Sequence, residues 1–186
     1  MLIYNGLSQL LPKSPVRLSF LHLTSLNSAI YLCGIQIKNH NTNYKMETAQ
    51  KTITVTATVN APVEKVWQFW NQPEHIMGWA FASDDWHAPF SENDLCTGGT
   101  FKTTMAAKDG SFSFDFGGEY TDVQEYNYIA YTMGDGRKVS IKFSGEGDST
   151  EIEEIFEPES QNSIEMQQGG WQMILNNFKK YAETNV

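Results

Sequence analysis

The C-terminal stretch SIEMQQGGWQMILNNFKKYAETNV, Ser163 to Val186, decides the architecture of this chain. Its large apolar side chains recur at spacings of three and four residues: Trp171, Ile174, Leu175, Phe178 and Tyr181. Such spacing places them on one face of an α-helix, with polar residues such as Gln172 and Asn177 on the other. We therefore predict one long helix here, whose apolar face has to pack against another element.

Residues 51–156 supply that element, because they read mainly as strands. In 51–60 (KTITVTATVN) apolar and threonine side chains alternate, which is typical of a strand with one buried face. Asn60 and Pro62 are suited to start a helix that Pro73 ends, and a short second helix follows over 73–79.

Six further strands are predicted: one near Trp86 in the irregular aromatic segment 79–90, and the others at 100–107, 111–123, 128–133, 138–144 and 149–156. Gly-containing turns separate most of these strands, which indicates consecutive hairpins and an antiparallel sheet. We expect Gly117-Gly118 to bend its strand. Since two helices interrupt the first and second strands, we expect a crossing on one edge to join these strands.

Charge divides the chain near residue 45. Residues 1–45 contain no Asp or Glu, whereas 46–186 carry 22 acidic and nine basic residues, a net charge of −13. This acidity disfavours a nucleic-acid partner, because phosphate binding needs clustered Lys and Arg. Cys96 is the one cysteine of the acidic part, so that part has no internal disulfide, which fits a reducing, cytoplasmic location.

We predict two parts: an extension over residues 1–45 and one domain over residues 46–186. Three interpretations of the extension remain open: upstream translated sequence with Met46 as the start, a weak export signal, or a genuine appendage. The apolar segment 18–35 is interrupted by polar residues, so we do not expect a membrane span.

Four segments carry a family resemblance. The segment TVNAPVEKVWQFWNQPEHIMGW (58–79) resembles the first strand and paired helices of the START-like (SRPBCC) superfamily. TGGTF (97–101) and FGGEYTDV (116–123) resemble its central strands. QQGGWQMILNNFKKYAE (167–183) resembles the terminal helix of the branch similar to the C-terminal domain of the Hsp90 ATPase activator. The resemblance covers about residues 51–184.

This resemblance implies an α+β helix-grip fold, in which a curved antiparallel sheet wraps around the long C-terminal helix. It also implies a cavity between sheet and helix that often holds an apolar ligand. The candidate lining residues are Trp67, Trp79, Phe81, Trp86, Phe101, Met105, Phe114, Phe116, Tyr120, Tyr131, Phe143, Trp171, Leu175 and Phe178. The alternative is a core that these rings fill completely.

Polar residues offer few sites for chemistry. Tyr120, Tyr131 and Thr103 are candidates for polar contacts to a ligand. His75, Asp84, Asp85 and His87 lack the spacing of a zinc site, so we expect structural or surface roles and no metal. The Gly pairs lack the context of a phosphate-binding loop, and we expect no cofactor.

Three functional hypotheses follow. The preferred one is binding of a hydrophobic or aromatic small molecule without chemistry at the site. The second is an enzyme of the polyketide cyclase or dehydratase type, which predicts a tyrosine or histidine with a perturbed pKa at the cavity. The third is an interaction domain that stimulates a chaperone ATPase, and a homodimer is left open as well.

Overall fold

The computed structural model describes residues 51–186. These residues form β1 (Ile53–Val59), α2 (Val63–Asn71), α3 (Pro73–Ile76), β2 (Trp86–Asn93), β3 (Thr100–Ala107), β4 (Ser113–Gln124), β5 (Tyr128–Met133), β6 (Lys138–Glu146), β7 (Ser149–Phe156) and α4 (Ile164–Asn185). The element order confirms the predicted succession of one strand, two short helices, six strands and a long helix. The extension predicted over residues 1–45 lies outside the described residues.

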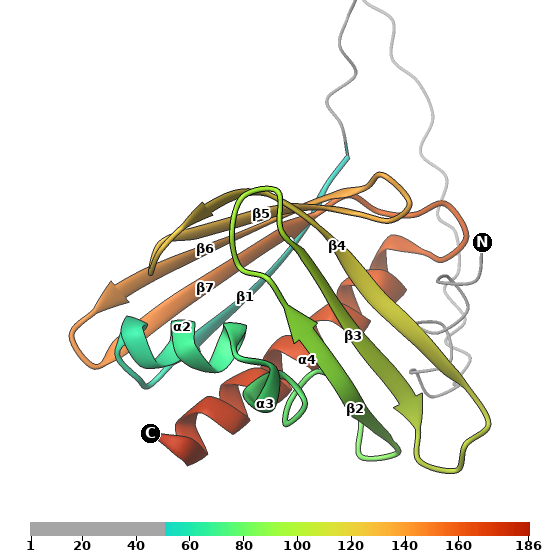
Figure 1. Cartoon of the computed structure of the whole chain (residues 1–186), viewed down its shortest axis with the longest axis horizontal. Coiled ribbons are helices and arrows are strands. Elements are labelled where there is room, and N and C mark those ends of the chain that lie inside the picture. Colours follow the sequence, from blue (N-terminus) through green and yellow to red (C-terminus); the bar gives the residue numbers. More distant parts are fainter. Residues whose placement is uncertain (1–50) are drawn as a thin grey trace, which may run out of the picture. The chain divides into compact units, whose positions relative to one another are not determined.

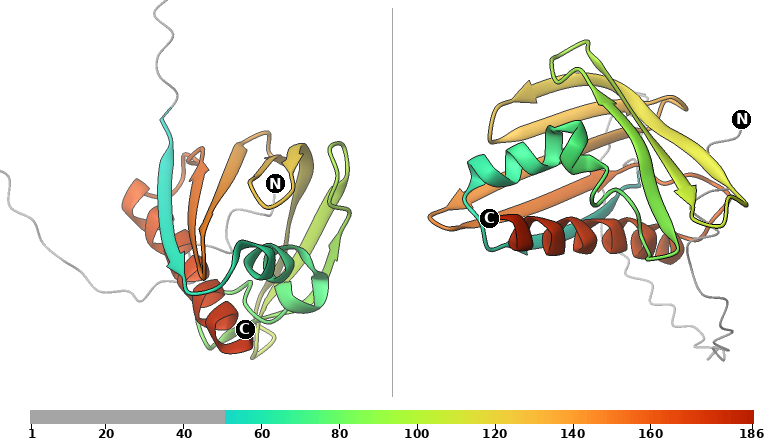
Figure 2. Two further views of the ribbon diagram at one scale, coloured as in Figure 1. Left: turned by 90° about the vertical axis from the view of Figure 1, so that its left-hand side faces the viewer. Right: turned by 60° about the horizontal axis from the view of Figure 1, so that its bottom comes forward.

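The seven strands make one antiparallel sheet in the order β1-β7-β6-β5-β4-β3-β2. The sheet is curled into a half-barrel, and α4 lies along its concave side (Figures 1 and 2). Short helices α2 and α3 lie between β1 and β2 in the chain and cover one end of that side (Figure 2). The arrangement confirms the predicted helix-grip fold.

The connection from β1 to β2 differs from the prediction. A crossing on one edge is wrong, because β1 and β2 occupy opposite edges of the sheet. The hairpins from β2 to β7 fill the space between these edges, so β7 arrives beside β1 and pairs with it from Ile53↔Phe156 to Val59↔Thr150. The segment with helices α2 and α3 consequently connects one edge strand of the half-barrel to the other.

The predicted cap of α2 is also wrong. Pro62 is the N-cap residue, and no side-chain cap bond is present there. Asn60 instead donates from its backbone N and its Nδ2 to Oε1 of Glu183, at 2.9 and 2.8 Å. Asn60 therefore fastens the start of the β1–α2 connection to the last turn of α4.

Helix α4 closes the concave side and protects the edge of the sheet. Ser163 caps it by accepting a hydrogen bond from the backbone N of Met166. Gln168 and Gln172 donate from Nε2 to the carbonyl oxygens of Thr54 and Thr56 on β1, at 3.1 and 2.9 Å. These bonds satisfy backbone groups that an open edge strand would present to other chains. Among residues 51–186, no helix is long and apolar enough to span a membrane.

Two adjacent glycines let β4 pass closely between its neighbours. A Cβ atom on Gly118 would lie 2.5 Å from the carbonyl oxygen of Thr132, and one on Gly117 would lie 2.6 Å from that of Phe101. The predicted bend at these glycines is not a break, since β4 runs unbroken from Ser113 to Gln124. The irregularity of β4 falls later, between Tyr120 and Asp122.

We expect Gly118→Ala to destabilise the protein by about 1–3 kcal/mol, because a backbone oxygen has no rotamer by which to avoid the new methyl group. Urea denaturation measures the change. Gly169→Ala is the matched control, since a Cβ atom at that position of α4 meets nothing within 4 Å. Helix propensity should make this control more stable by about 0.5–1 kcal/mol. Equal effects of the two substitutions would contradict the steric argument.

Candidate ligand-binding cavity

A cavity of about 100 Å³ lies between the sheet and the helices. Every described element except β1 contributes to its wall, from Trp70 on α2 to Leu175 on α4. The wall is largely apolar because alternate residues of each strand face the concave side, where α4 adds its own apolar stripe. A completely filled core, the alternative drawn from the sequence, is therefore not what the structure shows.

Nine of the fourteen candidate residues line this cavity. They are Trp79, Phe101, Met105, Phe114, Phe116, Tyr120, Tyr131, Trp171 and Leu175. The rings touch one another: the Phe101 and Tyr131 ring centroids are 4.8 Å apart, and those of Phe116 and Trp171 are 5.9 Å apart. That these residues bind a ligand remains a prediction.

Three candidates pack beside the cavity rather than into it. The ring of Trp67 meets Phe143 edge-on at 5.3 Å, so these two rings fill the end of the half-barrel under α2. Phe178 is fully buried and meets Trp70 and Trp79 at 4.7 and 5.0 Å. Trp70 and Trp79 both line the cavity, so Phe178 packs behind two residues of the wall.

The remaining two candidates lie near β2. Trp86 packs edge-on against Phe112 and Phe114, at 6.2 and 6.0 Å, and only Phe114 reaches the cavity. Phe81 is half-buried, and its carbonyl oxygen accepts a hydrogen bond from Nδ2 of Asn177 on α4. Both residues therefore support the wall without forming it.

Cavity-lining residues outside the list of fourteen are Trp70, Ile76, Ala80, Asn93, Thr103, Ile129, Ile141, Glu154 and Ile174. Thr103 was expected as a polar contact, and its Oγ1 is 3.0 Å from Oγ of Ser91. Glu154 is not among the residues predicted for the cavity, although the alternation along β7 places it there. Ile152 and Phe156 face the core, and Glu154 lies two residues from each of them, so it faces the same side.

A chain of hydrogen bonds ties one polar side of the cavity to the helices. The hydroxyl of Tyr120 donates to Oδ1 of Asn93 at 2.8 Å, and Nδ2 of Asn93 donates to the carbonyl oxygen of Asn71 at 2.7 Å. Burial raises the pKa of Tyr120, although the bond to Asn93 opposes this. The Tyr120 hydroxyl consequently stays protonated and committed to Asn93.

Glu154 is the one acidic residue of the cavity wall among the described residues. It is 6% exposed, and its partners across the sheet are Val55 and Ile141, which are 2% and 1% exposed. Within residues 51–186, its carboxyl group makes no hydrogen bond or ion pair. Burial raises its pKa from 4.5 to about 8, because no nearby charge or donor stabilises the ionised form.

Tyr131 is the second uncommitted polar group. It lies on β5, is 5% exposed, and its hydroxyl makes no hydrogen bond with the described residues. Burial raises its pKa well above the ordinary value, and the negative charge of Glu154 adds to this effect. A protonated tyrosine hydroxyl and a carboxyl group are therefore available to a molecule in the cavity.

The polar cluster weighed from the sequence does not assemble at this cavity. Nδ1 of His75 is 2.8 Å from the hydroxyl of Tyr181, whereas Asp84, Asp85 and His87 are exposed. Within residues 51–186 no group of three or more His, Cys, Asp or Glu side chains is placed to hold a metal ion.

Comparison with known proteins connects this architecture to a family. The family model described as "Activator of Hsp90 ATPase homolog 1-like protein" matches residues 60–183. The solution structure of an AHSA1-like protein from Aeromonas hydrophila has 42% identity and a TM-score of 0.69, covering 73% of this chain and 94% of its own. A solution structure from Cytophaga hutchinsonii has 60% identity and a TM-score of 0.63, with coverages of 72% and 93%.

A crystal structure from Nitrosomonas europaea shares the fold at 17% identity, with a TM-score of 0.63 and coverages of 74% of this chain and 97% of its own. The comparison with curated proteins found no match.

Proposed function

The chain belongs to the family of Activator of Hsp90 ATPase homolog 1-like proteins, and on this premise we propose that it binds a small hydrophobic or aromatic molecule between its sheet and α4. The family is one of ligand-binding or activator domains on the START-like fold. The cavity is the observation that carries the proposal: mostly apolar walls with a few uncommitted polar groups are typical of small-molecule sites.

The size of the cavity limits the ligand. At about 100 Å³ it is smaller than an apolar cavity of about 150 Å³ that admits benzene, and well below the several hundred Å³ of most ligand pockets. A compact ligand of roughly five or six non-hydrogen atoms fits with small side-chain adjustments. A fatty acid or flavonoid requires α4 or the α3–β2 segment to move outward.

We expect compact ligands such as benzene and methylcyclopentane to raise the melting temperature of the protein, because they bind the folded state only. A thermal-shift screen should also include fatty acids, flavonoids and polyketides, with two-dimensional NMR to locate the shifts at Tyr131 and Leu175. Leu175→Phe is the control, since its larger ring enters the cavity and should remove the response. Uniform silence of the wild-type protein across the screen would contradict the proposal.

An enzyme of the polyketide cyclase or dehydratase type is the second candidate. The observation in its favour is the pair of cavity groups with raised pKa, Tyr131 and Glu154, because a carboxyl group titrating near neutral pH suits general acid-base work. Product analysis by mass spectrometry, with wild-type protein and Glu154→Gln on linear polyketide substrates, tests it. Conversion of a polyketide by the wild-type protein but not by Glu154→Gln would show that the protein is an enzyme and does more than bind a ligand.

The family description favours a third candidate, stimulation of a chaperone ATPase. An ATPase assay of Hsp90 with and without the protein tests this role, and an unchanged rate would dismiss it.

A cytoplasmic location is part of the proposal. The thiol of Cys96 is free and exposed, and a reducing compartment keeps such thiols from forming disulfides.

A further inference from the structure

The carboxyl group of Glu154 has no role in holding the fold together. Its four neighbours on the same face of the sheet are apolar. They are Val55 and Ile141 on the adjacent strands, and Ile152 and Phe156 two residues away on β7. All four are at most 3% exposed. A buried carboxylate costs stability unless a partner compensates its charge, and an aliphatic side chain would suit this position better.

The rest of the wall offers no cation to this carboxyl group. Among the described residues that line the cavity, none is Lys, Arg or His. The titratable groups near Glu154 are Tyr131 on β5 and, through it, Tyr120 on β4. Arg137 also acts on Tyr131, but its guanidinium group is bonded to Asp135 and to the carbonyl oxygen of Glu157.

Aromatic rings form much of the rest of the cavity wall. Eight of the residues in the wall are Trp, Phe or Tyr, among them Trp70, Phe101 and Trp171. The faces of such rings attract cations, most strongly where water is excluded. A carboxyl group within an aromatic enclosure is the combination that recognises organic ammonium groups.

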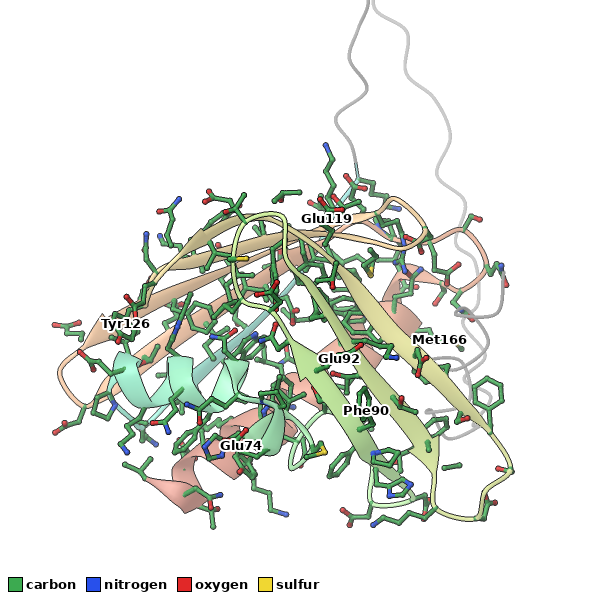
Figure 3. The ribbon with its side chains drawn as sticks, viewed as in Figure 1. Glu74, Phe90, Glu92, Glu119, Tyr126 and Met166 are labelled. Carbon is green, nitrogen blue, oxygen red and sulfur yellow. The ribbon has the colours of Figure 1, made fainter. Side chains whose placement is uncertain are left out.

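The charges discriminate among ligand classes. A fatty acid would bring a carboxylate into a wall that holds no cation, and a hydrocarbon would leave the carboxyl group of Glu154 without a partner. An ammonium group pairs with it and contacts the rings at the same time. The protein surface adds to this preference, because the chain has a net charge of −9 and exposes acidic residues such as Glu74, Glu92 and Glu119 on separate elements (Figure 3).

We propose that the cavity binds a small lipophilic amine, whose protonated nitrogen pairs with the carboxylate of Glu154 while its hydrocarbon part contacts the aromatic wall. This inference rests on the proposed function, since it requires the cavity to take a ligand. It assigns the polar end of the site to Glu154, with the hydroxyl oxygen of Tyr131 as a second acceptor for the ammonium group.

Three probes of nearly the same shape test the amine preference: cyclopentylamine, cyclopentanol and methylcyclopentane. We expect the wild-type protein to bind cyclopentylamine about tenfold or more tightly than cyclopentanol, measured by NMR titration at pH 7. Glu154→Gln keeps the shape of the side chain and should abolish this preference while still binding methylcyclopentane. Glu153→Gln is the control, because this substitution removes the same charge from an exposed position of the same strand.

Proton release gives an independent readout. Because the carboxyl group of free Glu154 is largely protonated at pH 7, binding of an ammonium ion should expel close to one proton. Isothermal titration calorimetry in buffers of different ionisation enthalpy measures this number, which should fall to zero in Glu154→Gln.

The outcomes separate the two proposals. Binding of methylcyclopentane without a preference for the amine, or an amine preference that survives in Glu154→Gln, overturns the amine assignment and leaves hydrophobic binding intact. Failure of all three probes, together with silence in the wider screen, overturns both.

Discussion

Glu154→Gln is expected to gain about 4–5 kcal/mol in stability relative to the wild-type protein as the pH rises from 4.5 to 8. Burial raises the pKa of Glu154 from 4.5 to about 8, so the folded state holds a proton that the unfolded chain releases. The stability that this proton confers is complete below pH 4.5 and is lost as the pH rises through 8. Over that interval the wild-type protein should lose about 1.4 kcal/mol per pH unit from this group.

Urea denaturation at intervals between pH 4.5 and 8.5 measures this effect as a difference between variants. Glu153→Gln removes the same charge from an exposed neighbour, so it should follow the wild-type curve. The nearby hydroxyls of Tyr120 and Tyr131 stay protonated throughout, because burial raises their pKa further. Parallel curves for Glu154→Gln and Glu153→Gln would contradict a buried, unpaired carboxyl group.

The sheet was predictable because alternation and turn chemistry are local. Each of the strands β3 to β7 lies within a few residues of its predicted range, and the stripe on α4 identifies the helix that closes the sheet. The edge-to-edge connection was not predictable. It depends on β7 pairing with β1, which lies about a hundred residues away in the chain and leaves no local signal.

The site was predictable only in part, for a related reason. Alternation along β6 shows that Ile141 and Phe143 face the same side, but it does not show that α2 covers one end of the sheet. Trp67 meets Phe143 at that end, and Ile141 is left to line the cavity. Which inward residues border open space depends on where the helices cross, and that is a property of the packed structure.

Glu154 illustrates the opposite case, a residue whose position the pattern does reveal. The strand reads STEIEEIF, and its inward positions are Thr150, Ile152, Glu154 and Phe156. A charged residue at an inward position conflicts with the local rule for strands, and such conflicts are expected at functional sites. The aromatic residues predict an apolar ligand. The inward carboxyl group of Glu154 indicates that this ligand also needs a polar group to pair with it.

Trp171→Ala is expected to destabilise the protein by about 3–5 kcal/mol, because it removes a buried indole and leaves a void that the rigid sheet cannot close. Trp171 is 7% exposed, stacks on Phe156 with ring centroids 4.0 Å apart, and meets Phe116 edge-on at 5.9 Å. Since Trp171 also lines the cavity, its removal joins the new void to the existing space of about 100 Å³.

Free indole should therefore restore part of the lost stability. We expect indole to raise the melting temperature of Trp171→Ala by more than it raises that of the wild-type protein, because the variant contains a space of matching shape. Phe178→Ala is the matched control: Phe178 is fully buried against Trp70 and Trp79 but does not line the cavity. It should lose comparable stability while leaving a smaller, separate void. An equal response of both variants to indole would show that Trp171 does not form the wall of the cavity.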